Sequence, residues 1–353
     1  MELFNTYVNV SQILDSVDFN ALYPGFCRYR FALYNSSKIC LDGKLIPYQQ
    51  DFRGNTSIWI DGGYIAIWNM ELDCNDDLEI LAYDLVHEMF HCHQRKNKES
   101  RFPSDLDLLN DPGDIDNFVK KYNENRYLAD AYEKSDVELL QKFIWIREER
   151  KKVHPHIVLQ EWKVETIEGM AEYIGLKALK QINTNKFLTK TNEYVERLRA
   201  QSKMLFDIRR ISYFSGAIYF LCMEKFGLPV INDFAKEITA YEQCSAALQP
   251  ITAEIFPYAF IPAEYNSQKN EKRKIIAKYI DGSSYVPCNA SICGYDPMNM
   301  YRSDDMVFCN HFVCLNQDGN SININLPVVL RLADGSNQRI IGYYICKERT
   351  RQK

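Results

Sequence analysis

Short hydrophobic runs separated by turn residues dominate the chain between residues 26 and 68. The last two runs, residues 57–60 and 64–68, are joined by Asp61-Gly62-Gly63. Aromatic and β-branched runs with a short glycine-containing connection predict strands that form a β-hairpin. We therefore expect a small sheet of the antiparallel type over about residues 26–68.

From residue 76 onward, the hydrophobic positions follow the period of a helix. Asn75-Asp76-Asp77 is suited to capping a helix that runs to about Gln94. The same period predicts helices over residues 128–150, 157–181, 186–207 and 211–226. The last of them is followed by Gly227-Leu228-Pro229, an order that ends helices. We therefore expect a mainly helical body over residues 76–260.

The pattern changes again beyond the polar, charged stretch 266–274. Residues 327–332 and 339–346 have the pattern of strands, and residues 333–338 suit the loop of a hairpin. We predict an α+β protein with two domains. Residues 1–266 would form the first domain, and a small β-rich domain would occupy residues 267–353.

Composition narrows the functional classes. A chain of 353 residues with 46% hydrophobic residues is expected to fold around a substantial core and is too long for a single small binding module. Its net charge of −5 disfavours nucleic acid or an anionic membrane as the main partner. The first residues lack the pattern of a secretory signal, and no hydrophobic run is long enough to span a membrane, so we expect a cytoplasmic protein. The eleven cysteines are accordingly expected to be mostly reduced and buried.

The clearest chemical signal is His87-Glu88-Met89-Phe90-His91, within the first helix of the predicted body. Residues four apart lie on one helix face a turn apart, so both imidazoles can bind one ion, with Glu88 beside them. This H-E-x-x-H pattern on a helix is typical of zinc peptidases, in which the glutamate is the general base. We therefore predict that His87 and His91 bind a single Zn²⁺ ion. The alternative is a pair of helix-face histidines beside a solvated glutamate.

A catalytic zinc ion usually has three protein ligands and an open position for water. His93 lies about 200° around the helix from His91 and therefore points away from the ion. His154 and His156 flank Pro155 in a predicted loop and are expected to face solvent. A glutamate is better supported as the third ligand.

Glu165, Glu168 and Glu172 share one stripe of the helix predicted over residues 157–181. Neighbouring like charges destabilise a helix, and Gly169 at its centre costs about 1 kcal/mol relative to alanine. A metal ion bound by Glu168 and another helix packed closely against Gly169 would explain both features. Glu172 would then orient a ligand histidine, or replace Glu168 as the ligand. The alternative is a solvent-facing acidic edge of the helix.

Three motifs follow one another between about residues 80 and 230: H-E-x-x-H at 87–91, E-G-M-A-E-Y at 168–173, and Tyr213-Phe214-Ser215-Gly216 at the start of an apolar helix. Together they resemble the gluzincin metallopeptidases, in particular the aminopeptidase N-like branch. That resemblance implies a zincin-like catalytic domain with Glu168 as the third zinc ligand. It also implies that Tyr213 contacts the oxyanion of the transition state.

Two features differ from that branch. Many more positions separate His91 from Glu168 than in the family, although the entropic cost of a longer loop rises only slowly with its length. The interval 92–167 includes an acidic segment, residues 105–116, and the sequence leaves open whether this interval covers the cleft.

The segment with which these aminopeptidases hold the free amine of the substrate is not found, since Asn69-Met70-Glu71 lies too close to the H-E-x-x-H helix. The choice between an endopeptidase and an aminopeptidase therefore stays open.

These features predict zinc-dependent hydrolysis of peptide bonds in a peptide or protein substrate. Glu88 would take a proton from a water molecule activated by the metal and pass it to the leaving amine, and Tyr213 would stabilise the oxyanion. The alternative is a catalytically silent metal-binding or interaction module with a β-rich tail that docks a partner. The intact Glu88 argues against this alternative, since a structural zinc site needs no base. The sequence does not indicate an oligomeric state.

Two further interpretations are weaker. The strand at residues 64–68 could pair with an extended substrate, although an ordinary sheet strand is favoured. Cys288, Cys293, Cys309 and Cys314 invite a second zinc site. Thiols five positions apart on a strand point to opposite faces, however, so separate buried cysteines are favoured.

Overall fold

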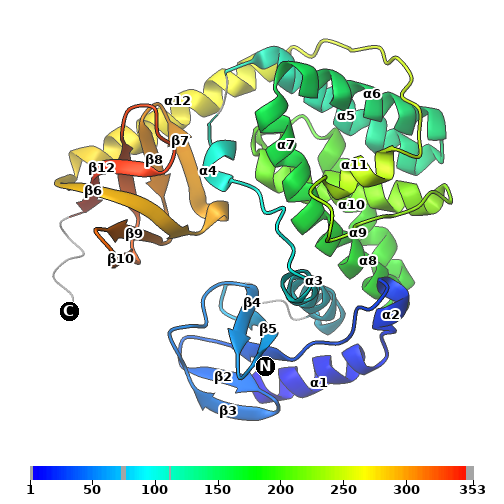
Figure 1. Cartoon of the computed structure of the whole chain (residues 1–353), viewed down its shortest axis with the longest axis horizontal. Helices are drawn as coiled ribbons and strands as arrows, with labels where there is room; N and C mark the ends of the chain where they lie inside the picture. The colour runs from blue at the N-terminus through cyan, green and yellow to red at the C-terminus, as the bar shows by residue number, and fades with distance from the viewer. Residues whose placement is uncertain (1–2, 73–76, 111–112, 347–353) are drawn as a thin grey trace.

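The computed structural model of the chain describes residues 3–72, 77–110 and 113–346. An N-terminal sheet with two helices, a helical body and a C-terminal sheet follow one another along the chain (Figure 1). The predicted α+β combination of helices and sheets is therefore confirmed. Among the described residues, no helix combines the length and the apolar character needed to cross a membrane.

The N-terminal part consists of two helices and five strands. Its elements are α1 (Leu3–Asp15), α2 (Phe19–Leu22), β1 (Phe31–Tyr34), β2 (Lys38–Leu41), β3 (Lys44–Pro47), β4 (Thr56–Ile60) and β5 (Gly63–Asn69). The strands lie in the order β3-β2-β1-β5-β4. Neighbouring strands are antiparallel except β1 and β5, which run parallel. The predicted sheet is present, but it is mixed and not purely antiparallel, because β5 returns alongside β1 after the β4–β5 hairpin.

The β4–β5 hairpin has the predicted connection. Asp61 and Gly62 have φ angles of 49° and 79°, the left-handed conformation of a two-residue hairpin turn. Strand β5 lies inside the sheet, between β1 and β4, so it is not an edge to which an extended substrate could be added. The interpretation of residues 64–68 as an ordinary sheet strand is therefore confirmed.

The helical body begins with α3 (Leu78–Lys96), which lies between the N-terminal sheet and the other helices (Figure 1). The further elements are α4 (Asp105–Leu108), α5 (Ile115–Lys134), α6 (Val137–Val153), α7 (Pro155–Val164), the π-helical turn η1 (Glu165–Gly169), α8 (Met170–Ile182), α9 (Thr184–Arg199), the 3₁₀ turn η2 (Lys203–Phe206), α10 (Ile208–Lys225) and α11 (Ala240–Ser245). The expected helical region over residues 76–260 is less continuous than predicted, since residues 226–239 and 246–259 contain no helix.

The ends of two helices follow the predicted signals. Asp77 caps α3 by accepting hydrogen bonds from the backbone N–H groups of Glu79 (3.1 Å) and Ile80 (3.4 Å). Asn75 and Asp76, predicted to share this role, lie outside the described residues. Beyond the end of α10, Gly227 adopts a left-handed conformation with a φ of 68°, which glycine accommodates without strain.

Three of the predicted helices are divided in the structure. The helix predicted over residues 128–150 is two helices, because Ser135 is left-handed with a φ of 55° and Asp136 caps α6. The helix predicted over residues 157–181 is interrupted by η1, and the one over 186–207 ends at Arg199 before η2. Hydrophobic residues recur on both sides of each break, so the hydrophobic pattern alone does not show these interruptions.

The main hydrophobic core lies where α8 packs against α3 and α10. Its fully buried residues include Leu85, Phe90, Ile174 and Phe220. Burial of these large side chains provides most of the favourable free energy that holds the three helices together. The core thereby fixes the positions of the two helices, α3 and α8, on which most of the predicted site residues lie.

A network of buried charges joins four elements of the body. It contains three basic and three acidic side chains, each at most 1% exposed: Lys121, Glu124, Arg147, Arg150, Glu161 and Glu165. Arg150 Nη2 lies 2.7 Å from Glu161 Oε2, and Arg147 Nε lies 2.9 Å from Glu124 Oε1. The network has no net charge, so every buried charge has a partner of opposite sign. It fixes α5, α6, α7 and η1 relative to one another.

We expect this network to make the fold sensitive to acid. Burial opposes ionisation of Glu161, but Arg150 and Lys121 hold its pKa far below its ordinary value of 4.5. Glu161 therefore stabilises the fold fully above pH 4.5, and this stabilisation is lost as the pH falls from 4.5 through the depressed pKa. The measurement is urea unfolding of the wild type and of Glu161→Gln between pH 7 and pH 3. The difference between their midpoints should shrink toward pH 3, and an unchanged difference would contradict the expectation.

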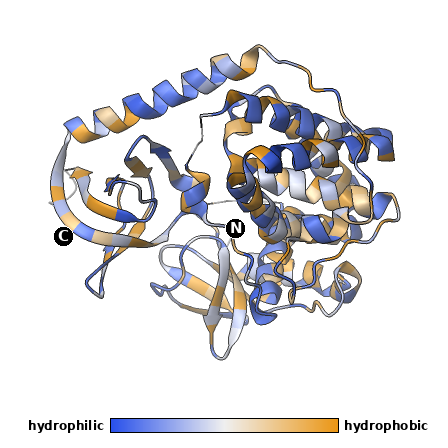
Figure 2. Ribbon diagram, turned by 45° about the horizontal axis from the view of Figure 1, so that its top comes forward, coloured by the Kyte–Doolittle hydropathy of each residue, from blue (hydrophilic) through white to orange (hydrophobic). Residues whose placement is uncertain are grey.

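A long helix connects the body to the C-terminal sheet. Helix α12 (Phe260–Asp281) is largely hydrophilic, as Figure 2 shows, and its buried residues are Ile261, Tyr265 and Ile276. The charged stretch 266–274, expected to separate two domains, lies inside this helix. The helical period was not recognised there because α12 has few hydrophobic residues.

The C-terminal sheet has seven strands in the order β10-β9-β6-β12-β11-β8-β7. Its elements are β6 (Ser283–Tyr295), the 3₁₀ turn η3 (Pro297–Asn299), β7 (Met300–Ser303), β8 (Met306–Cys309), β9 (Val313–Gln317), β10 (Asn320–Ile324), β11 (Val328–Leu332) and β12 (Arg339–Cys346). Strands β11 and β12 pair antiparallel, as predicted for residues 327–332 and 339–346. The predicted β-rich C-terminal part is therefore confirmed.

Candidate metal centre

His87 and His91 on α3 converge with Glu168 of η1. The two Nε2 atoms lie 3.0 Å apart, and Glu168 Oε2 lies 3.1 Å from His91 Nε2 and 3.5 Å from His87 Nε2. In a tetrahedral site with metal–ligand bonds of about 2.0–2.1 Å, the ligand atoms are about 3.3 Å from one another. The three atoms are thus spaced as ligands of one ion, and this group could hold a metal.

The hydrogen bonds of the imidazoles direct their lone pairs toward this common point. Gln94 donates its Nε2 to the carbonyl oxygen of Ile167 (3.0 Å), so its Oε1 accepts the hydrogen bond of 2.7 Å from His91 Nδ1. His87 Nδ1 lies 3.5 Å from Glu172 Oε1. With hydrogen on both Nδ1 atoms, both Nε2 atoms present lone pairs to the carboxylate of Glu168. Three electron-rich atoms at these distances repel one another unless a cation lies between them.

The charges around the imidazoles also favour a cation. Burial alone would lower the pKa of His87, but the nearby carboxylates of Glu168, Glu172 and Glu88 raise this pKa to about 10. A raised imidazole pKa means that the surroundings stabilise positive charge at this position. A divalent ion bound by the imidazole nitrogens would supply that charge, so the donor set fits a metal.

Glu88 has a buried carboxylate beside the candidate metal ligands. It follows His87 on α3 and is 7% exposed. Within the described part of the chain, its Oε2 has no hydrogen-bond partner. Buried polar atoms nearly always have a partner. An unpartnered carboxylate oxygen beside the candidate metal ligands is therefore suited to hold a water molecule.

The π-helical turn η1 gives the glutamates different directions. Glu168 points to the histidines of α3, whereas Glu165 pairs with Arg147 and accepts a hydrogen bond of 2.5 Å from the hydroxyl of Ser215. The expectation that Glu165 shares one stripe with Glu168 and Glu172 is therefore wrong. The cause is the π-turn, which contains more residues than an α-helical turn. Side chains on either side of it therefore point in different directions from those in a regular α-helix.

Gly169 lies at the predicted close approach of another helix. A Cβ atom at this position would be 2.7 Å from the Cα atom of Gly216 on α10, closer than side chains tolerate. The two glycines therefore let η1 and α10 touch through their backbones. This contact places the first two turns of α10 beside Glu168.

Tyr213 on α10 lies next to the metal-ligand group. Its ring centre is 6.2 Å from that of His87, with the planes 9° apart. Burial raises the pKa of the Tyr213 hydroxyl well above its ordinary value, and Glu168 raises it further through its charge and a hydrogen bond. The hydroxyl therefore keeps its proton and remains a hydrogen-bond donor near Glu168.

Glu172 contacts a ligand histidine and two tyrosines. Its Oε1 lies near His87 Nδ1, and its Oε2 accepts hydrogen bonds from the hydroxyls of Tyr194 (2.7 Å) and Tyr83. The three residues assembled within 4.8 Å of one another are His87, His91 and Glu168, without Glu172. Its place therefore suits orientation of His87 better than direct metal binding.

Two residues of the site were not predicted from the sequence. Gln94, one turn after His91 on α3, holds the ring of that histidine. Arg209, one turn before Tyr213 on α10, donates from Nη2 to Glu168 Oε1 (2.8 Å). Gln94 is three positions after His91, and Arg209 is four positions before Tyr213. Residues at these spacings share a helix face, so the spacing would have indicated both residues.

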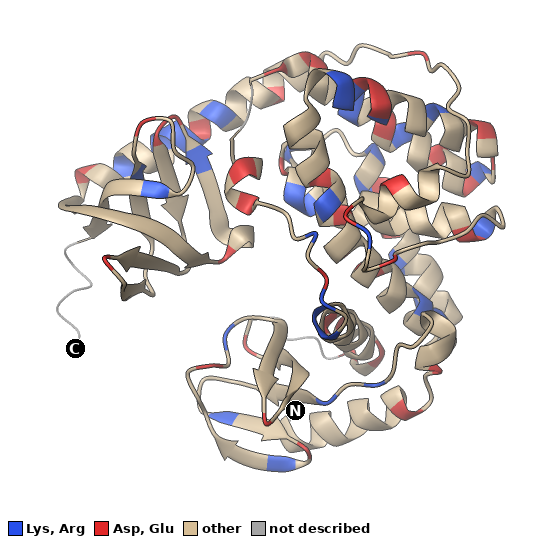
Figure 3. Ribbon diagram, viewed as in Figure 1, with Lys and Arg blue, Asp and Glu red and all other residues tan. Residues whose placement is uncertain are grey.

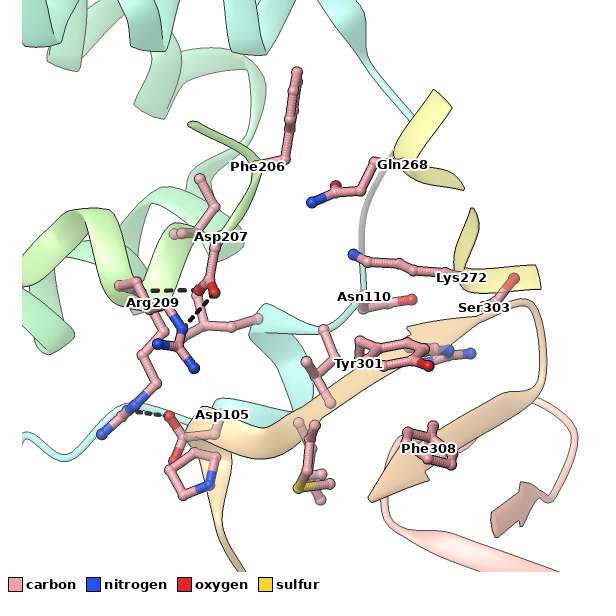
Figure 4. A pocket seen from close by; sticks show the side chains of 18 of the residues that line it. Asp105, Asn110, Phe206, Asp207, Arg209, Gln268, Lys272, Tyr301, Ser303 and Phe308 are labelled. Carbon is pink, nitrogen blue, oxygen red and sulfur yellow. Dashed lines mark hydrogen bonds and ion pairs between the residues drawn. The ribbon is translucent and has the colours of Figure 1, made fainter. Parts of the chain in front are cut away.

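Helix α4 connects Arg209 to the C-terminal sheet. Asp105 of α4 forms an ion pair with Arg209, shown in Figure 4. The next residue, Leu106, is buried in the hydrophobic core of the C-terminal sheet. Asp107 accepts a hydrogen bond of 2.8 Å from Asn337 Nδ2 in the loop before β12. The first residues of the acidic segment, 105–107, therefore lie between the candidate metal ligand Glu168 and the C-terminal sheet.

The remaining histidines lie away from the site. His93 is buried among Tyr23, Phe26 and Phe90, and burial lowers its pKa to about 4. It points away from the candidate ligands, as predicted. His156 is exposed as expected, but His154 is partly buried, with its Nε2 2.5 Å from Asp114 Oδ2, so the prediction that it faces solvent is wrong.

The cysteines form no second metal site in the part of the chain that the structure describes. Cys309 is buried, Cys293 is exposed, and Cys288 and Cys314 are half-buried. No disulfide joins any of the cysteines within the described ranges. The interpretation of these four residues as separate thiols agrees with the structure, although only Cys309 is fully buried.

Comparisons with known proteins give no match. A scan against protein-family models finds none that fits the chain, and searches of curated proteins and of solved structures find no similar protein. A function for this chain is therefore inferred from the geometry of its residues and from its motifs.

Proposed function

We propose that the protein is a zinc-dependent peptidase of the gluzincin type. The observation that supports this most is the convergence of His87, His91 and Glu168 beside a buried, unpartnered oxygen of Glu88. Two imidazole nitrogens and one carboxylate are a usual ligand set for a catalytic zinc ion, which keeps one position for water. A structural zinc site would more often have four protein ligands.

The proposal gives each residue of the centre a role. His87, His91 and Glu168 would hold the ion, which supplies the acidity that makes a water molecule reactive at neutral pH. Glu88 accepts the proton of this water and returns it to the leaving amine. The hydroxyl of Tyr213 donates a hydrogen bond to the oxyanion of the substrate.

Two neighbouring residues would keep the ligands in place. Gln94 holds His91 through its Nδ1 atom, and Glu172 does the same for His87. Such contacts set the tautomer of a ligand histidine and typically change metal affinity or activity by about 10–100-fold when they are removed. The same proposal includes a zincin-like fold for the domain that carries these ligands.

Removing the metal is the direct test of this proposal. We expect purified protein to contain about one zinc ion per chain by elemental analysis, because one group of three ligands is present. A chelator should abolish hydrolysis of a mixed peptide library, and added zinc should restore it. Mass spectrometry of the library would identify the cleaved bonds and so distinguish an endopeptidase from an aminopeptidase. Hydrolysis that persists in protein shown to be free of metal would overturn the proposal.

A further inference from the structure

Arg209 lies between the candidate metal ligand Glu168 and the short helix α4. It belongs to the first turn of α10, and its side chain is only 13% exposed. Its Nη2 donates a hydrogen bond of 2.8 Å to Glu168 Oε1. Its Nη1 forms an ion pair with Asp105 of α4, which is drawn as a dashed line in Figure 4. The two terminal nitrogens of one guanidinium therefore bind two carboxylates that belong to different elements.

The two oxygens of the Glu168 carboxylate have different neighbours. Oε1 accepts the hydrogen bond from Arg209. Oε2 lies near the imidazoles, 3.1 Å from His91 Nε2 and 3.5 Å from His87 Nε2. The terminal torsion of a glutamate side chain is broad, so a carboxylate without such a partner can exchange its oxygens or turn out of line. The bond from Arg209 opposes this rotation and keeps Oε2 directed toward the histidines.

The ion pair with Asp105 fixes the direction of the Arg209 donors. A guanidinium is planar and rigid, so the position of Nη1 determines where Nη2 points. Charge-assisted hydrogen bonds of this kind are about twice as strong as neutral ones. Asp105 at one terminal nitrogen and Glu168 at the other therefore hold the guanidinium plane in one orientation.

The helix that carries Asp105 is itself held in place. The backbone N–H of Ser104, at its N-cap, donates a hydrogen bond of 2.7 Å to Gln160 Oε1 on α7. Leu106 is buried in the core of the C-terminal sheet. Figure 3 shows α4 as a short acidic helix between the helical body and that sheet. Asp105 is thus a fixed anchor for Arg209 and not a mobile surface charge.

Helix α10 restrains Arg209 from the other side. The close backbone contact between Gly169 and Gly216 sets the distance of α10 from η1. Arg209 and Tyr213 lie four positions apart and therefore share one face of α10. The central carbon of the Arg209 guanidinium is 6.0 Å from the ring centre of Tyr213, at the outer limit of a cation–π contact. Both the start and the end of the Arg209 side chain are therefore held beside Glu168.

The positive charge of Arg209 has a cost for a metal site, and Asp105 offsets this cost. A cation beside a metal ligand repels the metal ion, and the repulsion is stronger in a buried place, where the dielectric constant is low. The ion pair of Arg209 with Asp105 is neutral as a whole. Arg209 can therefore orient Glu168 while the pair adds no net positive charge to the site.

We propose that Arg209 is a positioning residue of the metal centre, which turns the carboxylate of Glu168 so that Oε2 joins the two imidazoles as the third ligand. Asp105 acts through Arg209, because it fixes Nη1 and balances the charge of the guanidinium. This inference rests on the metal site of the proposed function and not on the hydrolysis of peptides.

The zinc affinity of Arg209→Lys tests this role. Lysine keeps the positive charge, but its single ammonium group does not form the planar fork that spans Asp105 and Glu168. The full-length apoproteins are titrated with Zn²⁺ in competition with a chelator that changes colour when it binds zinc. We expect the variant to bind zinc about 10–100-fold more weakly than the wild type, as is typical when a group that orients a ligand is lost. Equal affinities would overturn the proposal.

The absorption spectrum of the cobalt-loaded protein separates orientation of the ligand from stability of the fold. The visible bands of Co²⁺ depend on the number and arrangement of its ligands. At saturating Co²⁺, the bands of Arg209→Lys should differ from those of the wild type, because Glu168 would be turned differently. An unchanged spectrum would contradict the proposal, since Glu168 would then bind in the same way without the guanidinium.

Arg210→Lys is the matched control. Arg210 is the next residue of α10, and its Nε lies 2.9 Å from Asp207 Oδ2. Its Nη2 donates to the carbonyl oxygen of Met298. The same substitution at this position should leave the zinc affinity and the cobalt spectrum unchanged. An equal loss of affinity in both variants would speak against a specific role of Arg209.

If Arg209→Lys does not fold, Asp105→Asn is measured in its place. Asparagine keeps the shape of the side chain but removes the charge that anchors and balances Arg209. The zinc affinity of this variant should therefore fall severalfold. A variant that binds zinc as tightly as the wild type would show that Arg209 does not act in the proposed way.

The outcomes distinguish this proposal from the proposed function. If the zinc affinity falls in Arg209→Lys but the wild type cleaves no peptide, the peptidase function is rejected and the positioning role remains. If the wild type cleaves peptides with zinc bound, and Arg209→Lys binds zinc equally tightly, the peptidase function remains and the positioning role is rejected.

Discussion

Replacing Glu88 with glutamine should lower the rate of peptide hydrolysis by about 10²–10⁴-fold, because removing a general base typically has an effect of this size. Glutamine has nearly the same shape but cannot accept the proton of the attacking water. The three candidate metal ligands are untouched, so zinc content should stay near one ion per chain. The measurement is kcat for a peptide from the cleaved library, together with elemental analysis of the same sample.

Glu193→Gln is the matched control for this variant. Glu193 is exposed on α9 and lies outside the metal centre, so the same chemical change there should leave kcat and zinc content unchanged. An active Glu88→Gln enzyme would remove the assigned base. If both zinc and activity were lost, Glu88 would instead contribute to metal binding.

The second large effect is expected in the buried charge network. Arg150→Met should destabilise the fold by about 3–5 kcal/mol, because Glu124 and Glu161 would each lose one of their cationic partners in a fully buried place and the network would be left with a net negative charge. Methionine fills much of the volume of the arginine side chain, so the loss of charge contributes more than the loss of packing. The change is measured as a shift in the midpoint of urea unfolding, followed by circular dichroism.

Lys152→Met provides the comparison on the same helix. Its side chain is 69% exposed and forms an ion pair with the nearby Glu149, and such surface pairs contribute about 0–1 kcal/mol. Its midpoint should therefore stay close to that of the wild type. A similar small shift in Arg150→Met would mean that the network contributes little to the stability of the body.

The metal-ligand group shows which parts of a site can be predicted from sequence. His87 and His91 lie four positions apart on a helix, so local geometry alone brings them together. Glu168 is distant from both histidines in the sequence. It was nevertheless predicted as the third ligand, because neighbouring glutamates and a central glycine are unfavourable in a helix unless a metal ion and a closely packed helix compensate for them. The structure shows that Gly169 does contact another helix closely. That Glu168 binds a cation remains a prediction.

Other features depend on contacts that no local pattern contains. Glu165 has the spacing of a stripe residue but points to Arg147, because the π-helical turn changes the direction of the face. The link from Asp105 to Arg209 joins residues 104 positions apart and involves only common residue types. Helix α12 was not predicted because polar residues cover most of its surface. Such features arise from tertiary packing, which overrides local preference.

Helix α4 has a consequence for how the chain can be divided. Leu106 belongs to the core of the C-terminal sheet, although that sheet begins with Ser283. A fragment truncated after α12 would expose Leu106 and Leu109 to water and would release Asp107 from Asn337. The loosened α4 would no longer support Asp105 beside Arg209. The N-terminal portion would therefore not keep the arrangement around the candidate metal centre by itself, and cutting away the last strands by proteolysis would disturb that arrangement from a distance.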